Sequence, residues 1–134
     1  MATVTTKIAR TYKDLDLLFN VHPIKKDINK HTAELAVINS IKNLVLTNHY
    51  ERLFQPDIGS NVNKLLFENM DLITAAALER EIQQVIENYE PRARIYKVSV
   101  IPDYDNNKFS VDMEFLINNL TEPITITFFL ERVR

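Results

Sequence analysis

The spacing of apolar residues changes along the chain, from a helical period in the first two thirds to a period of two near the end. Residues 32–47 and residues 74–90 repeat apolar side chains at intervals of three and four, which predicts two amphipathic helices. Thr32 is a suitable N-cap for the first helix. Pro91 ends the second helix, because proline cannot continue the backbone hydrogen bonding of a helix.

Shorter elements precede and separate these two helices. Residues 1–13 are polar and are expected to form a loose or partner-dependent arm, and residues 14–19 alternate in the manner of a short strand. Gly59 indicates a turn, after which Ser60 or Asn61 can cap a short helix. The segment between the two long helices therefore holds a third, shorter helix.

The period of two predicts three consecutive strands within residues 96–100, 109–117 and 124–130. In the first strand, Tyr96, Val98 and Val100 alternate with Lys97 and Ser99, so the three larger apolar side chains are expected on the same buried face. Short turns join the strands, so they should form an antiparallel meander.

Together these elements predict an α+β fold, with three helices packed on a small antiparallel β-meander and a short N-terminal strand. The length of 134 residues suits one domain, which we place at residues 14–134. The hydrophobic fraction of 46% is sufficient for one core.

Composition narrows the possible functions. The net charge of −2 lacks the basic character of nucleic-acid binders, and no apolar run is long enough to span a membrane. Cysteine is absent, which removes thiol chemistry and cysteine metal sites. The single glycine, Gly59, excludes glycine-rich phosphate loops, since average usage would give roughly nine glycines.

One turn imitates a calcium-binding loop. Asp103, Asp105 and Asn107 alternate, and Glu114 stands twelfth in the run. Lys108 occupies the position where such a loop needs glycine, and strand geometry would carry Glu114 about 16 Å from the turn. A hairpin turn explains the pattern better. The three histidines have no zinc-binding spacing either.

Paired acids could in principle hydrolyse a glycosidic bond. The candidate pairs are Glu79 with Glu81, and Glu87 with Glu90. All four residues belong to a helix whose outer face would be charged in any case. With 18 acidic residues in the chain, such pairs carry little information.

The last strand carries apolar side chains on both faces, because Phe128 and Phe129 are adjacent. Val133 lies on the same face as Phe129. One interpretation is an edge strand covered by the N-terminal arm. The other is an edge that accepts a strand of a partner protein by β-augmentation.

The sequence Glu90-Pro91-Arg92 also has two interpretations. Pro91 ends a helix, and the flanking charges could simply be solvated. Alternatively, the proline fixes the backbone so that a carboxylate and a guanidinium are presented side by side. Arginine offers a rigid fork of donors suited to carboxylates and carbonyls at interfaces.

Several stretches in this order and spacing are those of one known family. They are Ser40–Leu44 (SIKNL), Phe54–Gly59 (FQPDIG), Leu65–Asn69 (LLFEN), Glu79-Arg80 and Asn88–Arg92 (NYEPR), with Asp14–Asp16 and Val98–Pro102 in support. The chain resembles the baseplate wedge subunits of contractile-tailed bacteriophages, a sheath-initiator family with relatives in type VI secretion baseplates. The resemblance covers about residues 14–132.

The resemblance implies a structural protein without enzymatic activity. In the family, the Glu-Pro-Arg motif contacts the bundle formed by larger wedge proteins, which here implies docking through Glu90, Pro91 and Arg92. The C-terminal strand of the family pairs with the tail sheath protein. In this chain that role falls on Ile124, Thr125, Ile126, Thr127, Phe128, Phe129 and Leu130.

The expected partners are therefore other baseplate wedge proteins and the tail sheath protein, with no cofactor, metal, small-molecule substrate, nucleic acid or membrane. The expected location is the tail baseplate of the virion, after synthesis in the host cytoplasm. Two alternatives remain. One is a cell-wall hydrolase, since some members of the family are labelled lysozyme-like, and the other is a free regulatory adaptor of the same fold.

Overall fold

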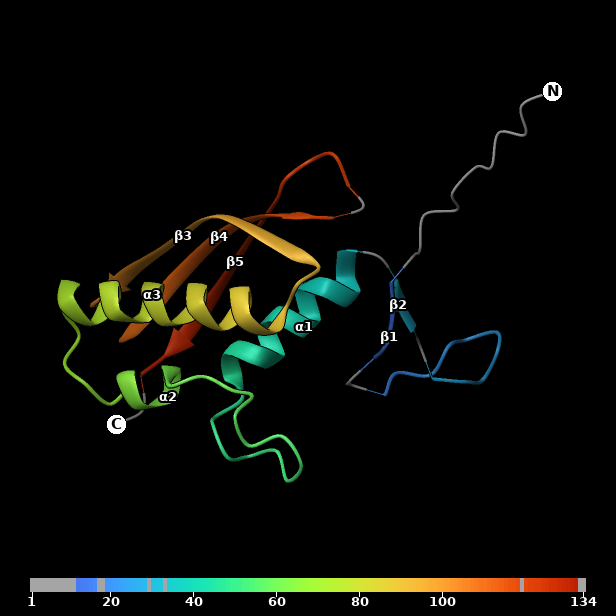
Figure 1. The fold of residues 1–134 in the computed structure, drawn as a ribbon, viewed down its shortest axis with the longest axis horizontal. Coiled ribbons are helices and arrows are strands. Elements are labelled where there is room, and N and C mark those ends of the chain that lie inside the picture. Colours follow the sequence, from blue (N-terminus) through green and yellow to red (C-terminus); the bar gives the residue numbers. More distant parts are fainter. Residues whose placement is uncertain (1–11, 17–18, 29, 33, 119, 133–134) are drawn as a thin grey trace.

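The computed structural model describes residues 12–16, 19–28, 30–32, 34–118 and 120–132. The elements in chain order are β1 (Lys13–Leu15), β2 (Lys30–Thr32), α1 (Glu34–Leu46), α2 (Val62–Leu65), α3 (Leu72–Tyr89), β3 (Ala93–Asp103), β4 (Lys108–Ile117) and β5 (Ile124–Glu131). Strands β3, β4 and β5 form an antiparallel sheet in that order, and the helices cover one of its faces (Figure 1). This arrangement confirms the predicted α+β fold with its meander and short N-terminal strand.

The core lies between the sheet and the two long helices. Strand β4 is central, and every second side chain on it is buried, because one face of the strand meets the helices. The largest fully buried side chains of α1, α3 and β4 are Val37, Ile41, Val45, Leu78, Ile82, Ile86, Phe109, Val111, Met113, Phe115 and Ile117. These positions belong to the predicted apolar stripes, whereas Leu35 and Leu46, which would widen the stripe of α1, are more than half exposed.

Both long helices begin at residues other than those predicted. Helix α3 starts at Leu72, two residues early, because the carboxylate of Asp71 accepts a hydrogen bond from the Thr74 backbone N–H at 2.7 Å. The assignment of Thr32 as the cap of α1 is wrong, since Thr32 is the last residue of β2 and α1 begins at Glu34.

The burial predicted for Tyr96 is also wrong. The pairing of β3 with β4 shifts between Ile95 and Lys97, so Tyr96 occupies a β-bulge and its side chain is exposed. A bulge adds one residue to the strand and reverses the alternation beyond it. Ala93 therefore faces the core before the bulge, and Val98 faces it after the bulge.

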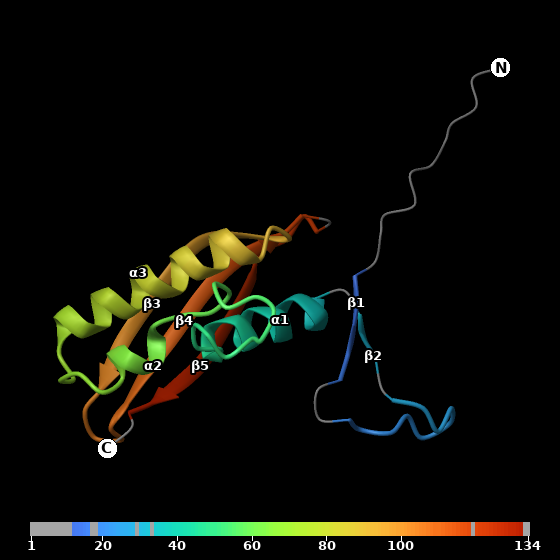
Figure 2. The same cartoon turned by 60° about the horizontal axis from the view of Figure 1, so that its bottom comes forward.

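Strand β2 was not predicted. It pairs with β1 through Lys13–Thr32, Asp14–His31 and Leu15–Lys30, and this hairpin lies beside the start of α1 (Figure 2). Residues 1–11, the main part of the predicted arm, lie outside the described residues.

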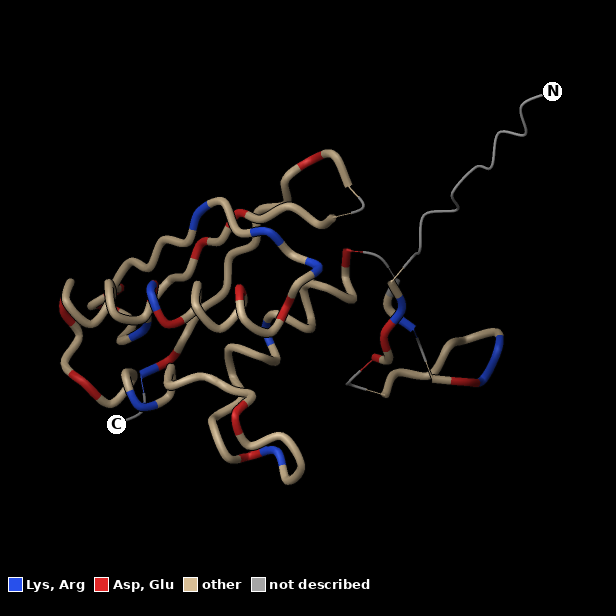
Figure 3. The backbone as a smooth tube through the Cα atoms, in the orientation of Figure 1, with Lys and Arg blue, Asp and Glu red and all other residues tan. Residues whose placement is uncertain are grey.

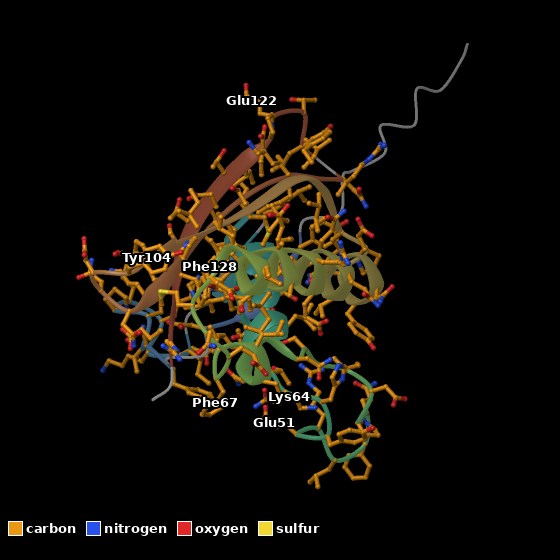
Figure 4. All side chains as sticks on the ribbon, turned by 90° about the vertical axis from the view of Figure 1, so that its left-hand side faces the viewer. Glu51, Lys64, Phe67, Tyr104, Glu122 and Phe128 are labelled. Atoms are coloured by element: carbon orange, nitrogen blue, oxygen red, sulfur yellow. The ribbon has the colours of Figure 1, made fainter. Side chains whose placement is uncertain are left out.

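Charges of both signs are interspersed along the described part of the chain, and Figure 3 shows no large region of a single sign. No helix among the described residues is both long and apolar enough to cross a membrane. The β3–β4 turn with Tyr104 and the β4–β5 turn with Glu122 lie at opposite ends of the sheet (Figure 4). Asp103 accepts hydrogen bonds from Asn106 in the first of these turns, which confirms a hairpin there.

Helix α2 is capped by its neighbours. The Ser60 hydroxyl accepts a hydrogen bond from the Val62 N–H at 3.3 Å, and Glu81 of α3 accepts one from the Asn61 N–H at 2.8 Å. Asn61 occupies the N-cap position but makes no capping hydrogen bond with its side chain.

The loop between α1 and α2 returns to its starting point at Gly59. Asn48 and Ser60 form an isolated parallel bridge, and the Ser60 N–H donates to the Thr47 carbonyl at 2.8 Å. A Cβ atom on Gly59 would lie 2.6 Å from the carbonyl carbon of Asn48 and from the backbone nitrogen of His49. Only glycine allows the two ends of the loop to pass this closely.

We expect Gly59→Ala to lower the free energy of unfolding by about 1–3 kcal/mol, because the added methyl group would force the two backbone segments apart. Chemical denaturation followed by circular dichroism would measure the loss. Gln84→Ala, on the exposed face of α3, serves as the control and should change stability by less than about 0.5 kcal/mol. Equal stabilities of the two variants would show that the loop closes without this contact.

Candidate functional site

The Glu90–Arg92 turn joins α3 to β3 and is the first of the two predicted binding segments. At the end of α3, the Glu90 N–H donates a hydrogen bond to the Ile86 carbonyl at 2.9 Å. Asn118 then holds the turn from the end of β4. Its side-chain amide donates to the Pro91 carbonyl at 2.9 Å and its backbone N–H donates to the Arg92 carbonyl at 3.0 Å. The turn is thus held by α3 before Pro91 and by Asn118 at Pro91 and Arg92, which fixes the direction of the chain.

The carboxylate of Glu90 is buried, with only 2% of the residue exposed. The Arg92 guanidinium binds it through two parallel bonds, from Nε to Oε1 at 2.5 Å and from Nη2 to Oε2 at 2.6 Å. The Ser40 hydroxyl of α1 donates a further hydrogen bond to Oε2. Bidentate pairs of this kind are among the strongest polar contacts in proteins. Glu90 is therefore an internal group, and its interpretation as a solvated charge is wrong.

The ionisation of this pair follows from its surroundings. Burial alone would raise the pKa of Glu90, but the hydrogen bonds from Arg92 and Ser40 and the charge of Arg92 outweigh it. The pKa therefore lies below the ordinary value of 4.5. The hydrogen bond to Glu90 is the main cause that raises the pKa of Arg92. Both groups are charged at neutral pH.

Arg92 is also held on its other side. Its guanidinium carbon lies 5.3 Å from the centre of the Tyr12 ring, within the range of a cation–π contact. The side chain is still 28% exposed. The guanidinium is thus fixed in direction while part of it remains open to a partner.

A surface groove runs beside the turn, with a volume of about 470 Å³. Asn43 and Leu44 of α1 line one side, and Arg52 and Ile58 of the loop between α1 and α2 line another. Pro91 and Arg92 complete the wall. Asp14 of β1 also lines the groove, which therefore combines apolar side chains with the cations Arg52 and Arg92 and an exposed carboxylate.

The second predicted segment is β5, an edge strand of the sheet. Along it, Ile124, Ile126 and Phe128 (Phe128 is labelled in Figure 4) pack against the core, whereas the residues between them are exposed. Leu130 is 2% exposed, and the Phe129 ring is 57% exposed with the Lys108 ammonium 4.3 Å from its centre. Among the described residues, no strand pairs with the outer edge of β5. Val133 lies outside the described residues.

Both segments were predicted from the sequence as binding segments, but the groups that position them were not predicted. Ser40 stands on α1 among apolar residues, and this isolated hydroxyl was the available signal for a buried polar partner. Nothing in the sequence linked Tyr12, Asn118 or Arg52 to the turn. Within the described ranges, no cluster of three or more His, Asp or Glu side chains is placed to hold a metal ion.

Comparison with known proteins gives a family and a set of similar folds. The family model described as "Baseplate wedge protein gp25" matches residues 31–120. The baseplate wedge protein gp25 of Enterobacteria phage T4 is 35% identical over 114 residues, which cover 82% of this chain and 83% of that protein.

Three solved structures share the fold. A chain of the anti-feeding prophage baseplate has a TM-score of 0.71 and 21% identity, covering 82% of this chain and 88% of its own. A putative tail lysozyme from Geobacter sulfurreducens has a TM-score of 0.70 and 20% identity, covering 75% and 92%. A chain of the post-contraction pyocin R2 baseplate has a TM-score of 0.61 and 14% identity, covering 80% and 99%.

The family match spans more than half of the chain, including the Glu90–Arg92 turn, and the phage T4 relative is similar over most of its length. The protein therefore belongs to the family of baseplate wedge protein gp25.

Proposed function

We propose that this structural baseplate protein docks on the wedge core through the Glu90–Arg92 turn and starts sheath assembly at β5. Its partners are then the other baseplate wedge proteins at the turn and the tail sheath protein at the strand. In this proposal the chain is made in the host cytoplasm and works in the baseplate of the virion. Membership of the wedge family supports the structural role.

The observation that carries the docking proposal is the bidentate pair of Arg92 with Glu90. Two of the five guanidinium N–H groups are used internally, and Nη1 makes no hydrogen bond within the described residues. A side chain that is already fixed loses little conformational entropy when a partner binds it. Nη1 can therefore bind a carbonyl or carboxylate of the wedge core in a defined direction.

The three residues of the turn then have different roles. Glu90 is buried and holds Arg92 in place, so it does not contact the partner directly. Pro91 is exposed and rigid, and Arg92 supplies the charge. The partner-binding surface is thus made by Pro91 and Arg92, with Glu90 as its internal support.

The sheath role of β5 rests on its place in the sheet. An edge strand offers backbone N–H and carbonyl groups that a further strand can pair with. The inner face of β5 is anchored by Leu130 and its apolar neighbours, so the edge is presented by a rigid element. Phe129 adds an exposed apolar side chain next to the place where a partner strand would lie.

The alternative of a cell-wall hydrolase has one supporting observation, the name "putative tail lysozyme" of a protein with the same fold. A general acid in such an enzyme needs a raised pKa, whereas the pKa of Glu90 is lowered by its ion pair. Two of the other candidate acids are also held by hydrogen bonds within the protein, since Glu81 accepts hydrogen bonds from Asn61 and Glu87 accepts one from Gln83. A peptidoglycan release assay on the purified protein would separate the two functions, because an active protein that loses activity in Glu87→Gln would favour the hydrolase.

The second alternative, a free regulatory adaptor of the same fold, would instead co-purify with a protein outside the baseplate.

We expect Arg92→Lys to lower incorporation into baseplate wedges by about tenfold or more while the fold is retained. Lysine keeps a charge for Glu90 but lacks the planar fork that contacts two groups at once. Alanine would be a poorer test, because it leaves the buried carboxylate without its cation. Co-purification with the co-expressed wedge proteins would measure incorporation. Arg80→Lys, an exposed arginine of α3, is the control, and equal incorporation of both variants would contradict the docking role.

We expect Glu90→Gln to lower the free energy of unfolding by about 1–3 kcal/mol at neutral pH, because a charge-assisted bidentate bond is lost. The folded-state pKa of Glu90 is lowered, so its contribution is fully present above the unfolded-state pKa near 4.5 and is lost as the pH falls through the folded-state value. The difference between wild type and variant should therefore shrink on acidification. Urea unfolding at a series of pH values would measure it, and a difference that stays constant would show that the carboxylate charge is irrelevant.

We expect Phe129→Ser to leave the fold intact, since more than half of this side chain is exposed, and to reduce the number of sheaths that start on assembled baseplates. A strand paired with β5 would lose an apolar neighbour. Negative-stain electron microscopy of baseplates mixed with purified sheath protein would count the sheaths. Tyr104→Ser, exposed in the β3–β4 turn, is the matched control. A normal count for Phe129→Ser would place the sheath contact elsewhere.

A further inference from the structure

The loop between α1 and α2 carries the most exposed apolar side chains among the described residues. Leu53 is 92% exposed and Phe54 is 96% exposed. The loop extends away from the sheet and from the long helices (Figures 1 and 4). Large apolar side chains that are exposed to solvent next to one another on a projecting loop are typical of a binding contact.

This loop is held in shape by its own hydrogen bonds. The Glu51 carboxylate accepts hydrogen bonds from the Asn48 backbone N–H at 2.9 Å and from its side-chain amide at 2.6 Å. Across the loop, the Tyr50 N–H donates to the Pro56 carbonyl at 2.9 Å. Leu53 and Phe54 thus lie between two bonded ends, so their presentation to solvent is fixed by the backbone around them.

The loop is also joined to the docking groove. The Tyr89 hydroxyl, one residue before Glu90, donates to the Asp57 carbonyl at 2.8 Å. Arg52 and Ile58 line the same groove as Pro91 and Arg92. A partner that occupies this groove would therefore also meet the loop, and the two surfaces are continuous.

Charge adds a second element of specificity. Arg52 is exposed and makes no ion pair within the part of the chain that the structure describes. It directly precedes the two apolar residues, so one short segment offers a cation followed by two large apolar side chains. The complementary surface on a partner is an apolar pocket bordered by a carboxylate.

We infer that Arg52, Leu53 and Phe54 form a second binding contact, called here the second anchor. It binds in such a pocket on the same wedge-core partner that binds the Glu90–Arg92 turn. This inference rests on the proposed function, since it names a further contact with the same partner. Arg92 sets the direction of docking, and the loop supplies the apolar area that a polar turn lacks. A few arginine and aromatic side chains commonly dominate the affinity of an interface, and Arg52 and Phe54 offer one of each class.

The test compares binding of purified variants to the purified complex of the larger wedge proteins, by biolayer interferometry. We expect the double variant Leu53→Ser/Phe54→Ser to raise Kd by about tenfold or more, and Arg52→Glu to raise it as well. The matched control is Leu72→Ser/Ile73→Ser, because these side chains are 74% and 80% exposed at the start of α3. The control should stay within about twofold of wild type. Circular dichroism and urea unfolding should show wild-type stability for the loop variants, whose altered side chains are all exposed.

The outcomes separate this inference from the docking proposal. Weaker binding by the loop variants, with the control unchanged, supports the second anchor. Unchanged binding by the loop variants together with weaker binding by Arg92→Lys overturns the second anchor and leaves docking at the turn intact. Unchanged binding by all of them, Arg92→Lys included, overturns both. Light scattering that shows a wild-type dimer abolished by the loop variant would assign the loop to a second copy of the chain and would also overturn the inference.

Discussion

The buried carboxylate of Glu90 is the constraint on which the rest of the site depends. A carboxylate removed from water is destabilising unless it is paired and hydrogen-bonded. Here the pairing requires Ser40 of α1 to meet Glu90 and Arg92, which lie in the turn between α3 and β3. The two long helices and the first strand of the sheet are thus locked together where the helix–strand break occurs. The rigidity of the turn follows from the cost of leaving this charge without its partners.

The elements that could be predicted from the sequence are those in which burial follows one period. The stripes of α1 and α3, and the alternation of β4, each meet a single apolar layer, so their patterns translate directly into structure. The expectation failed at Tyr96, because a bulge reverses the alternation and depends on pairing with β4 rather than on local sequence. It also failed for β2, a strand of only three residues whose existence depends on β1.

The candidate site shows a similar division. Residue types and order led to the prediction of Glu90, Pro91 and Arg92 as a docking site, but the two opposite charges gave no indication of which one faces inward. That distinction is set by Ser40, which is 50 positions away in the sequence and reaches Glu90 only after α1 has packed beside α3. The groove is similarly non-local, since Arg52 and Ile58 enter it through a loop closed by Gly59. Long-range packing decided both features, and no local pattern carries that information.

The proposed function requires this small protein to hold two partners at once, and the sheet order is compatible with that requirement. Strand β3, which follows the Glu90–Arg92 turn, forms one edge of the sheet, and β5 forms the other edge. Only β4 separates them, so the two edges are roughly 10 Å apart at the usual strand spacing. The register pairs Ala93 with Ile117 and Ile124 with Phe115, which brings the start of β5 to the same end of the sheet as the turn. In the proposed function, a partner at the turn would lie in the groove formed with α1 and the loop between α1 and α2, whereas an added strand would pair with the outer edge of β5. The two proposed contacts would then belong to one rigid domain, which favours a rigid transfer of position between the two partners rather than a hinge between them.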